Sequence, residues 1–412
     1  MTAPRVLLVA PDRSYRTGAF VNAGNALGIQ ITVASWGQTP LALNQGGIRI
    51  DPRSPASSLP RIRDAASGVP FAAILATDDA TVPLAHEICL ELGLPTNEPS
   101  ALQASTNKLR FRQACKEKGI TAPCFMVIEP QAPVPSNIAP VEFPCVVKPL
   151  SLSASRGVIR CENQEDITKA IPRVRTLISD EDSKGDQRVL IENYIDGDEY
   201  SVEALLHNRE LKIIAIFEKP DRLSGPFFEE TIYVTPPRIP KRSQNAIYAA
   251  LSQLVSALGF CEGPVHAELR LAADGIHFIE LASRTIGGRC GRVIEFLTGV
   301  SLEAIVLANA VGQPIQSKQQ AGAFGVMMIP VPCAGVLRRV EGITAARKVP
   351  GIVSVDIDIR EGHRMVPWPE GGPYPGFIFS RGNDATQAEA SLREAHAKLC
   401  FVTAPEIKVE VT

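Results

Sequence analysis

The first hundred residues alternate between short apolar runs and helical patterns, and this alternation limits the fold more than any other feature. The runs that read as buried strands are residues 5–10, 30–35 and 71–76. The helical patterns are residues 18–27 and 82–92. Strands separated by helices form parallel sheets with crossover helices. We therefore predict a Rossmann-like N-terminal lobe. It lacks the Gly-x-Gly-x-x-Gly fingerprint after the first strand, so dinucleotide binding is not inferred.

The rest of the chain reads as short strands mixed with helices, which indicates an α+β organisation. At 412 residues the chain is too long for one compact core, so two or three lobes are expected. The expected strands are 141–148, 158–161, 189–194 and 200–206, followed by a hairpin at 265–281. A smaller α+β module is expected at the end, closed by a helix at 385–399.

Composition argues against several classes of protein. The formal charge is −2 and no basic stretch is present, so no nucleic-acid partner is expected. No apolar stretch is long enough for a signal segment or a membrane span, so we expect no membrane partner and a cytoplasmic protein. The nine cysteines are scattered without a C-x-x-C pair, which favours buried thiols in a reducing compartment.

Lys148 ends an apolar strand and precedes a run of small residues. A strand-end lysine can project its ammonium into a cleft, where it serves as a point charge for phosphate. Ser153, Ser155 and Gly157 lie in the following loop, whose hydroxyl and backbone N–H groups can wrap phosphate oxygens. Taken one at a time, a solvated lysine and an ordinary hairpin turn are the simpler interpretations.

The strand at 189–194 stops at a turn that is followed by acidic residues. The residues at its end are Glu192, Asn193, Tyr194 and Ile195. Backbone groups of such a strand edge can read adenine, and the carboxylate of Glu199 can hold ribose hydroxyls. The alternative is the alternation of a half-buried sheet, which also places Glu199 and Glu203 on one face.

The sharpest feature is the hairpin signal Asp274-Gly275 between two strands that each carry a glutamate. With a three-residue loop and Gly275 in the left-handed region, Glu268 and Glu280 face each other with Cβ atoms ~5 Å apart. Opposed carboxylates repel unless a cation intervenes, and Mg²⁺ shared with phosphates is the usual solution. In a different register, the two acids would point apart into solvent.

Arg284 follows Glu280 at the exit of the second strand, and Gly287 and Gly288 come soon after. A guanidinium there can bind a substrate carboxylate or the anion that develops during transfer. The two glycines allow a ligand to approach the backbone closely. The simpler interpretation is a surface arginine before a glycine turn.

Taken in order, these signals resemble the ATP-grasp superfamily. The series consists of Lys108 on a helix, Lys148, the small-residue loop, Glu192 followed by Gly-x-Glu199, and Glu268…Glu280-x-x-x-Arg284. It spans about residues 106–312. The resemblance implies an α/β and α+β protein with the ATP-grasp fold. Its domains would be a Rossmann-like N-terminal domain (1–105), a mobile lid (106–190), a catalytic core (191–320) and a C-terminal α+β module of the catalytic lobe (321–412).

The resemblance also implies a role for each residue. The residues that would contact ATP are Lys108, Lys148, Ser153, Ser155, Gly157, Glu192, Asn193, Tyr194, Ile195 and Glu199. Glu268 and Glu280 would hold Mg²⁺, with Mn²⁺ as the alternative ion. Arg284 would be catalytic, stabilising the acyl-phosphate and the tetrahedral intermediate. It would also bind substrate, together with Gly287 and Gly288.

Two departures from the superfamily pattern refine the resemblance. The loop is poorer in glycine than in many members, and Ala282 stands where many members have a metal-ligating Asn. An Ala or Gly at that position is similar to the L-amino-acid ligase branch, which makes dipeptides. The Gly-x-x-His-x-Glu run at 263–268 and the module from Gly322 onward also resemble that branch.

The resemblance therefore implies an ADP-forming carboxylate–amine ligase that works through an acyl-phosphate on amino acids or a related small carboxylate. One alternative is an enzyme of purine synthesis that activates bicarbonate or formate. The other is an ATP-binding module without catalysis. The partners would be small-molecule carboxylate and amine substrates. Homodimers are common in the family, and the sequence leaves the oligomeric state and the two substrates open.

Overall fold

The computed structural model describes residues 3–12, 14–36, 47–52, 54–183, 185–315 and 318–406. Its N-terminal lobe is a parallel sheet in the order β3-β2-β1-β4, as predicted. The strands are β1 (Arg5–Ala10), β2 (Gln30–Ser35), β3 (Ile48–Arg49) and β4 (Ala73–Ala76). The helices of this lobe are α1 (Arg16–Leu27), α2 (Pro55–Gly68) and α3 (Val82–Leu92).

A second, small sheet has the order β5-β8-β6-β7. Its strands are β5 (Phe125–Ile128), β6 (Cys145–Pro149), β7 (Ile159–Cys161) and β8 (Val189–Asn193), and α6 (Gln164–Glu181) packs on it. Two helices lead into this sheet, α4 (Pro99–Thr106) and α5 (Lys108–Glu117). The strand expected at 141–148 begins only at Cys145, because the preceding Pro144 has no N–H to donate to a ladder.

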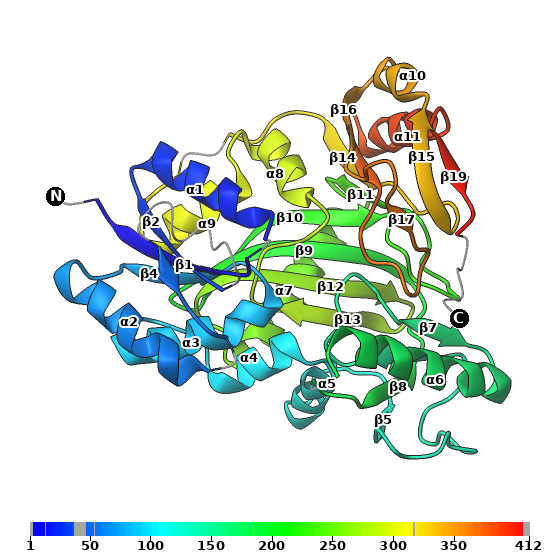
Figure 1. Cartoon of the computed structure of the whole chain (residues 1–412), viewed down its shortest axis with the longest axis horizontal. Coiled ribbons are helices and arrows are strands. Elements are labelled where there is room, and N and C mark those ends of the chain that lie inside the picture. Colours follow the sequence, from blue (N-terminus) through cyan, green and yellow to red (C-terminus); the bar gives the residue numbers. More distant parts are fainter. Residues whose placement is uncertain are drawn as a thin grey trace, which may run out of the picture.

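The third and largest sheet, the central sheet, has eight strands in the order β13-β12-β9-β10-β11-β14-β18-β16. Its first five strands along the chain are β9 (Asp198–His207), β10 (Glu210–Lys219), β11 (Ile232–Thr235), β12 (Gly263–Ala272) and β13 (Gly275–Ala282). The other three are β14 (Ala323–Met328), β16 (Ile352–Ile357) and β18 (Gly376–Gly382). Figure 1 shows the N-terminal lobe, the small sheet and the C-terminal elements arranged around this sheet.

Alternation along β9 separates the two faces of the central sheet. Val202, Ala204 and Leu206 pack in a core with α7 (Lys241–Leu258), α4 and α5. The opposite face carries Glu199 and Glu203. Further along, this face is covered by α8 (Cys290–Thr298), α9 (Leu302–Ala310) and the N-terminal lobe. The site-bearing acids therefore share one face of the sheet.

The C-terminal elements add a three-stranded sheet and two helices. The sheet has the order β17-β15-β19, with β15 (Gly335–Glu341), β17 (Arg364–Met365) and β19 (Cys400–Ala404). The helices are α10 (Ile343–Arg347) and α11 (Ala385–His396). β14, β16 and β18 come from the predicted C-terminal module but belong to the central sheet. β8 crosses the predicted boundary between residues 190 and 191 and belongs to the small sheet. The predicted division into four domains stays a prediction.

The β12–β13 hairpin differs from expectation in one respect. Ala272 pairs with Gly275, so the loop has two residues instead of the three expected. An irregularity follows, because Leu269 faces Phe278 while Glu268 faces Glu280, which leaves Ile279 as an extra residue on β13. This bulge restores the predicted pairing of the two glutamates. Gly275 has a φ of +139°, which favours glycine.

Within the described part of the chain, no single helix is long and apolar enough to cross a membrane. The pair α8 and α9, bent by 80°, passes the same test by length and composition only. Most residues of both helices are buried in the protein core.

Candidate active site

A pocket lies between the small sheet and the polar face of the central sheet. Eight of the ten predicted nucleotide residues line it: Lys108, Lys148, Ser155, Glu192, Asn193, Tyr194, Ile195 and Glu199. Glu268 and Glu280 line it from the hairpin, and Leu223 and Phe228 add apolar surface. Ser153 lines a smaller adjoining cavity together with Lys108 and Glu280. Gly157 lies apart from both, where its N–H donates to Pro369 O at 3.0 Å.

Lys148 is held by a buried carboxylate. Its ammonium donates to Glu192, which also accepts from Arg112 Nε at 2.7 Å and Nη2 at 3.1 Å. Burial lowers the pKa of Lys148 to about 8 against the opposing pull of Glu192. Burial alone would raise the pKa of Glu192, but the charges of Arg112 and Lys148 prevail and lower it to about 2. The Glu192 side chain is thus occupied by two cations and holds Lys148 in place.

Lys108 begins α5 directly after the N-cap Asn107. The Asn107 side chain accepts from the N–H groups of Leu109 and Arg110, which fixes the start of the helix. The Lys108 ammonium donates to Leu152 O at 2.9 Å and lies 3.4 Å from Glu280 Oε2. A short local motif therefore places this cation between the small-residue loop and the predicted metal ligand.

Residues 151–158, here called the phosphate loop after the contacts predicted for them, contain two consecutive residues in an unusual conformation. Ala154 and Ser155 have φ values of 56° and 54°. Non-glycine residues rarely adopt positive φ, and those that do cluster at binding sites where the surroundings fix them. Backbone N–H groups in such loops form concave anion sites.

Glu268 and Glu280 are paired in register, and each faces cations. Glu268 Oε1 lies 3.0 Å from Lys219 Nζ and 3.4 Å from His266 Nε2. Burial would raise the pKa of Glu268, but Lys219 and His266 outweigh burial and hold it well below its usual range. Glu280 keeps a lowered pKa despite burial, because of the nearby charge of Lys108. Both acids are therefore ionised oxygen donors of the kind that Mg²⁺ prefers, and they fit the predicted ion.

A second carboxylate group surrounds Lys219. Oxygens of Glu199, Glu230 and Glu268 lie within 4.8 Å of one another. The ammonium of Lys219 contacts them at 2.7, 2.7 and 3.0 Å. The cation at this centre is thus a lysine. Glu199, predicted to bind ribose, also accepts from Arg270 Nε at 2.9 Å, so its carboxylate is fixed before any ligand binds.

Arg284 joins the hairpin to the N-terminal lobe. Its Nε donates to Asp79 Oδ1 at 2.8 Å, and its Nη2 lies 3.8 Å from Glu280 Oε1. Gly287 and Gly288 precede α8. A Cβ on Gly288 would lie 2.5 Å from the sulfur of Met328, and its φ is +57°, so packing and backbone conformation explain that glycine. A Cβ on Gly287 would meet only Arg16, at 3.7 Å.

Four further residues of the site escaped prediction. Arg112 and Lys219 lie within ordinary helix and strand patterns, although Lys219 ends an apolar strand as Lys148 does, and that signal could have found it. His266 binds Glu203 through Nδ1, and this charge, opposing burial, raises its pKa to about 9. Asp79 follows an apolar run, at the end of a parallel strand where sites collect.

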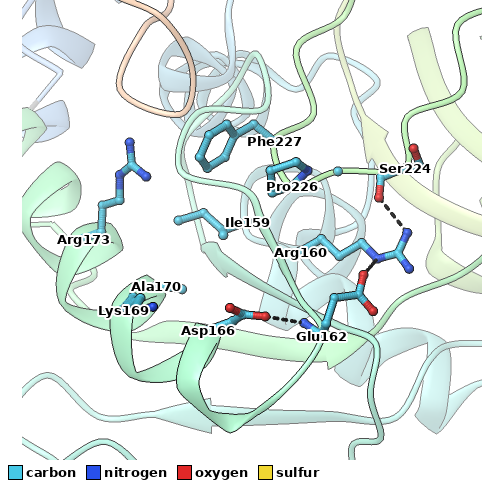
Figure 2. A pocket seen from close by; sticks show the side chains of 11 residues that line it. Ile159, Arg160, Glu162, Asp166, Lys169, Ala170, Arg173, Ser224, Pro226 and Phe227 are labelled. Carbon is cyan, nitrogen blue, oxygen red and sulfur yellow. Dashed lines mark hydrogen bonds and ion pairs between the residues drawn. The ribbon is translucent and has the colours of Figure 1, made fainter.

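Another cavity, of about 420 Å³, opens between β7, α6 and residues 224–227 (Figure 2). No predicted site residue lines it. Arg160 donates there to Ser224 O, and its Nε lies 2.8 Å from Glu162 Oε1. Asp166 accepts from the Glu162 N–H. Among the charged side chains of this wall, Arg160 therefore pairs with Glu162, whereas Lys169 and Arg173 pair with Glu165 and Glu370.

Two family models match the chain. One describes an ATP-grasp domain and covers residues 141–293. The other describes an L-amino acid ligase C-terminal domain and covers residues 327–404. The two matches therefore include strands of both sheets that form the pocket and most of the C-terminal elements.

Two protein relatives share 24% of aligned residues with the chain. The uncharacterized protein y4rH of Sinorhizobium fredii aligns over 77% of this chain and 66% of its own length. Dapdiamide A synthase of Enterobacter agglomerans aligns over 62% of this chain and 62% of its own length. The chain thus matches just under two thirds of the length of each relative.

Several solved structures share the fold over nearly the whole chain. L-amino acid ligase from Bacillus licheniformis is 23% identical with a TM-score of 0.81, covering 98% of this chain and all of that one. N5-carboxyaminoimidazole ribonucleotide synthetase from Thermotoga maritima is 16% identical with a TM-score of 0.68, covering 97% and 100%. Phosphoribosylglycinamide synthetase from Anaerococcus prevotii is 15% identical with a TM-score of 0.66, covering 98% and 100%.

Proposed function

We propose that this chain, which contains an ATP-grasp domain and a C-terminal domain like that of L-amino acid ligases, joins a carboxylate to an amine, forming ADP and phosphate. The observation that carries the proposal is the meeting of Lys108, Lys148, Glu268 and Glu280 in one pocket, with Arg284 against Glu280. The substrate class is an amino acid or a related small carboxylate, paired with a small amine.

In the first step, the carboxylate of one substrate attacks the γ-phosphate of ATP, the bond from that phosphorus to the β,γ-bridging oxygen breaks, and ADP leaves an acyl-phosphate behind. Lys108 and Lys148 bind and orient the phosphates, and their charges offset the negative charge that is spread over the oxygens. Mg²⁺ held by Glu268 and Glu280 would supply further charge neutralisation when bound. Glu192 keeps Lys148 in place, and the phosphate loop covers the reacting groups.

In the second step, the amine attacks the acyl-phosphate and phosphate leaves. Arg284 stabilises the oxyanion of the tetrahedral intermediate, as a preorganised donor in a buried site. Asp79 holds this guanidinium in place through a 2.8 Å hydrogen bond. Exclusion of water by the phosphate loop protects the acyl-phosphate from hydrolysis.

The test is ADP release from MgATP in the presence of single amino acids and of pairs. Release that requires a pair, with a coupled product found by mass spectrometry, is the expected result. ATP binding without turnover on any carboxylate and amine would contradict the proposal and favour a non-catalytic module. Two separate measurements test the remaining expectations. Light scattering of the purified protein tests for a homodimer, and cell fractionation tests the cytoplasmic location expected from the sequence.

A second candidate function is ribotide chemistry of the purine-synthesis type. It is favoured by the shared fold of the Thermotoga maritima and Anaerococcus prevotii enzymes, although their TM-scores of 0.68 and 0.66 are below 0.81. ADP release that requires an aminoimidazole ribotide with bicarbonate, and that is silent with amino acids, would select this function instead.

A further inference from the structure

A loop of the C-terminal module contacts the phosphate loop directly. Residues 366–372, here called the clasp loop, connect β17 toward β18 and extend to the small sheet (Figure 1). The indole Nε1–H of Trp368 donates to Ala154 O at 2.9 Å. The N–H of Gly157 donates to Pro369 O at 3.0 Å. Two hydrogen bonds therefore join segments that are more than two hundred residues apart.

An ion pair and close packing anchor the clasp loop beside these bonds. Arg173 of α6 binds both carboxylate oxygens of Glu370, with Nη2 to Oε2 at 2.8 Å. The same guanidinium lies 5.0 Å from the ring centroid of Phe227, and Figure 2 shows both side chains at the cavity on this side of α6. A Cβ on Gly372 would lie 2.9 Å from Arg156 Cδ, so the clasp loop and the phosphate loop are in close contact.

The acceptor of the indole bond is the peptide between the two residues of unusual conformation. Ala154 and Ser155 have positive φ, which only surrounding contacts can hold in place for non-glycine residues. In a trans peptide the C=O and the following N–H point in opposite directions. The bond from Trp368 to Ala154 O therefore turns the Ser155 N–H away from the indole. Ser155 lines the pocket that contains Lys148.

Trp368 is itself rigidly supported. Only 5% of the residue is exposed, and its ring stacks on Tyr374 with centroids 4.9 Å apart. Tyr374 in turn meets Phe377 of β18, so a packed aromatic row connects the indole to the central sheet. The donor is thus fixed by the fold of the C-terminal module and not by the phosphate loop that it contacts.

We propose that Trp368 is a positioning residue for the phosphate loop, so that the C-terminal module supplies part of the ATP site. The inference rests on the ATP binding of the proposed function. It predicts that nucleotide affinity depends on a residue that lines neither the nucleotide pocket nor the cavity beside the phosphate loop.

The first test is Trp368→Phe, which removes the indole donor and keeps an aromatic ring. The dissociation constant of MgADP, measured by calorimetry, should rise about 3- to 10-fold, as expected for one lost hydrogen bond. In the ligase assay, KM should rise for ATP and stay unchanged for the amine. The matched control is Trp36→Phe, because Trp36 packs in the N-terminal lobe away from the pocket. Unchanged MgADP affinity in W368F would overturn the inference.

Fluorescence gives a second readout that does not depend on activity. The chain has two tryptophans, so W36F leaves Trp368 as the only one. Its emission should change on addition of MgADP, whereas W368F should show no comparable change. If Trp368 emission does not change although the protein binds MgADP, this inference is overturned and the proposed function stands. Absence of MgADP binding by the wild type would overturn the proposed function with it.

Glu370→Gln is a second variant of the clasp loop, and it tests the inference even if Trp368→Phe does not fold. Glu370 is partly exposed, and its replacement removes the charge that binds Arg173 without opening the core. We expect E370Q to weaken MgADP binding in the same direction as W368F but by a smaller factor, with an unchanged thermal midpoint. Wild-type affinity in both variants would contradict the inference.

Discussion

Replacing Glu280 by glutamine removes one negative charge from a place where Lys108 and Arg284 approach the carboxylate to 3.4 and 3.8 Å. The side chain keeps its size, so the protein should stay folded. ADP formation should fall by a factor of about 100 or more, because an amide is a poor ligand for Mg²⁺ and one charged contact in the site is lost. The measurement is ADP release under saturating MgATP.

The matched control for this change is Glu341→Gln. Glu341 lies exposed on β15 and pairs with Arg339, away from the pocket. It should leave ADP release unchanged. A near-normal rate for E280Q would contradict the metal assignment of Glu280.

The lowered pKa of Lys148 predicts that nucleotide binding depends on pH. Burial lowers its pKa from 10.5 to about 8, so the folded protein loses this charge above pH 8. Phosphate groups favour the charged form, so affinity for MgADP should fall by up to tenfold per pH unit above 8, with proton uptake on binding. Because the folded-state pKa is lowered, the unfolded chain holds more protons between pH 8 and 10.5. The contribution of Lys148 to folding stability therefore rises with pH in that window.

Calorimetry at pH 8.5 in two buffers of different ionisation enthalpy would measure the proton uptake. In Lys148→Arg the cation stays charged, so both the uptake and the alkaline loss of affinity should disappear. Equal affinity of the wild type at pH 7 and pH 9.5 would contradict a role for Lys148 in phosphate binding.

At the scale of single residues, sequence order found the side chains that end strands or begin helices. Lys108 and Lys148 occupy such positions, whereas Glu268 and Glu280 were found from the pairing of a hairpin, and all four line one pocket. Their assigned roles stay predictions. Arg112 was not found, because its partner Glu192 is 80 residues away and its other acceptors are carbonyl oxygens of β13. Contacts of this kind depend on the packing of helix against sheet, which a local pattern does not encode.

At the scale of elements, the β12–β13 hairpin shows how a correct pairing can rest on an incorrect loop. The hairpin signal and the two strands were predictable from Asp274-Gly275 and the flanking alternation. The loop is one residue shorter than expected, and a bulge at Ile279 compensates for it. Bulges depend on cross-strand packing and twist, so the sequence alone could not indicate this one.

The start of α5 offers a test of how an element positions a site residue. Asn107→Ala removes the side-chain acceptor for the N–H groups of Leu109 and Arg110, which should cost about 1 kcal/mol of folding stability. Lys108 follows directly, so a frayed helix start should also weaken MgADP binding. The measurements are urea unfolding and calorimetry.

Asn163→Ala is the matched control. Asn163 caps α6 in the same way, by accepting from Asp166 N at 3.1 Å, but lies outside the pocket. It should cost a similar amount of stability and leave MgADP affinity unchanged. Equal effects of the two variants on affinity would show that the cap of α5 has no special relation to the site.

At the scale of the whole molecule, the order of strands in the central sheet was beyond the reach of sequence patterns. β14 lies between β11 and β18, and β16 forms the edge, so strands from the last ninety or so residues continue a sheet begun before residue 220. Alternation predicts which residues share a face of a strand but not which strands become neighbours. For the same reason, the contact between the clasp loop and the phosphate loop has no signature in the sequence.

An ion pair links Asp79 of the N-terminal lobe directly to Arg284, beside core packing between this lobe and α8 and α9, and its contribution can be measured. Arg284 Nε and Asp79 Oδ1 lie 2.8 Å apart across 205 residues of chain. Asp79→Asn should lower the free energy of unfolding by about 1 kcal/mol, since the amide oxygen can still accept from Arg284 but the negative charge is lost from a partly exposed position. ADP formation should fall as well, because Arg284 would lose the partner that orients it.

The matched control is Glu91→Gln, which removes an exposed ion pair with Arg63 inside the N-terminal lobe. It should change the free energy of unfolding by less than about 0.5 kcal/mol and leave activity intact. A double-mutant cycle with Arg284→Lys isolates the coupling between positions 79 and 284. A coupling near zero would mean that the ion pair with Asp79 does not orient Arg284, and that contacts within the catalytic core orient it instead.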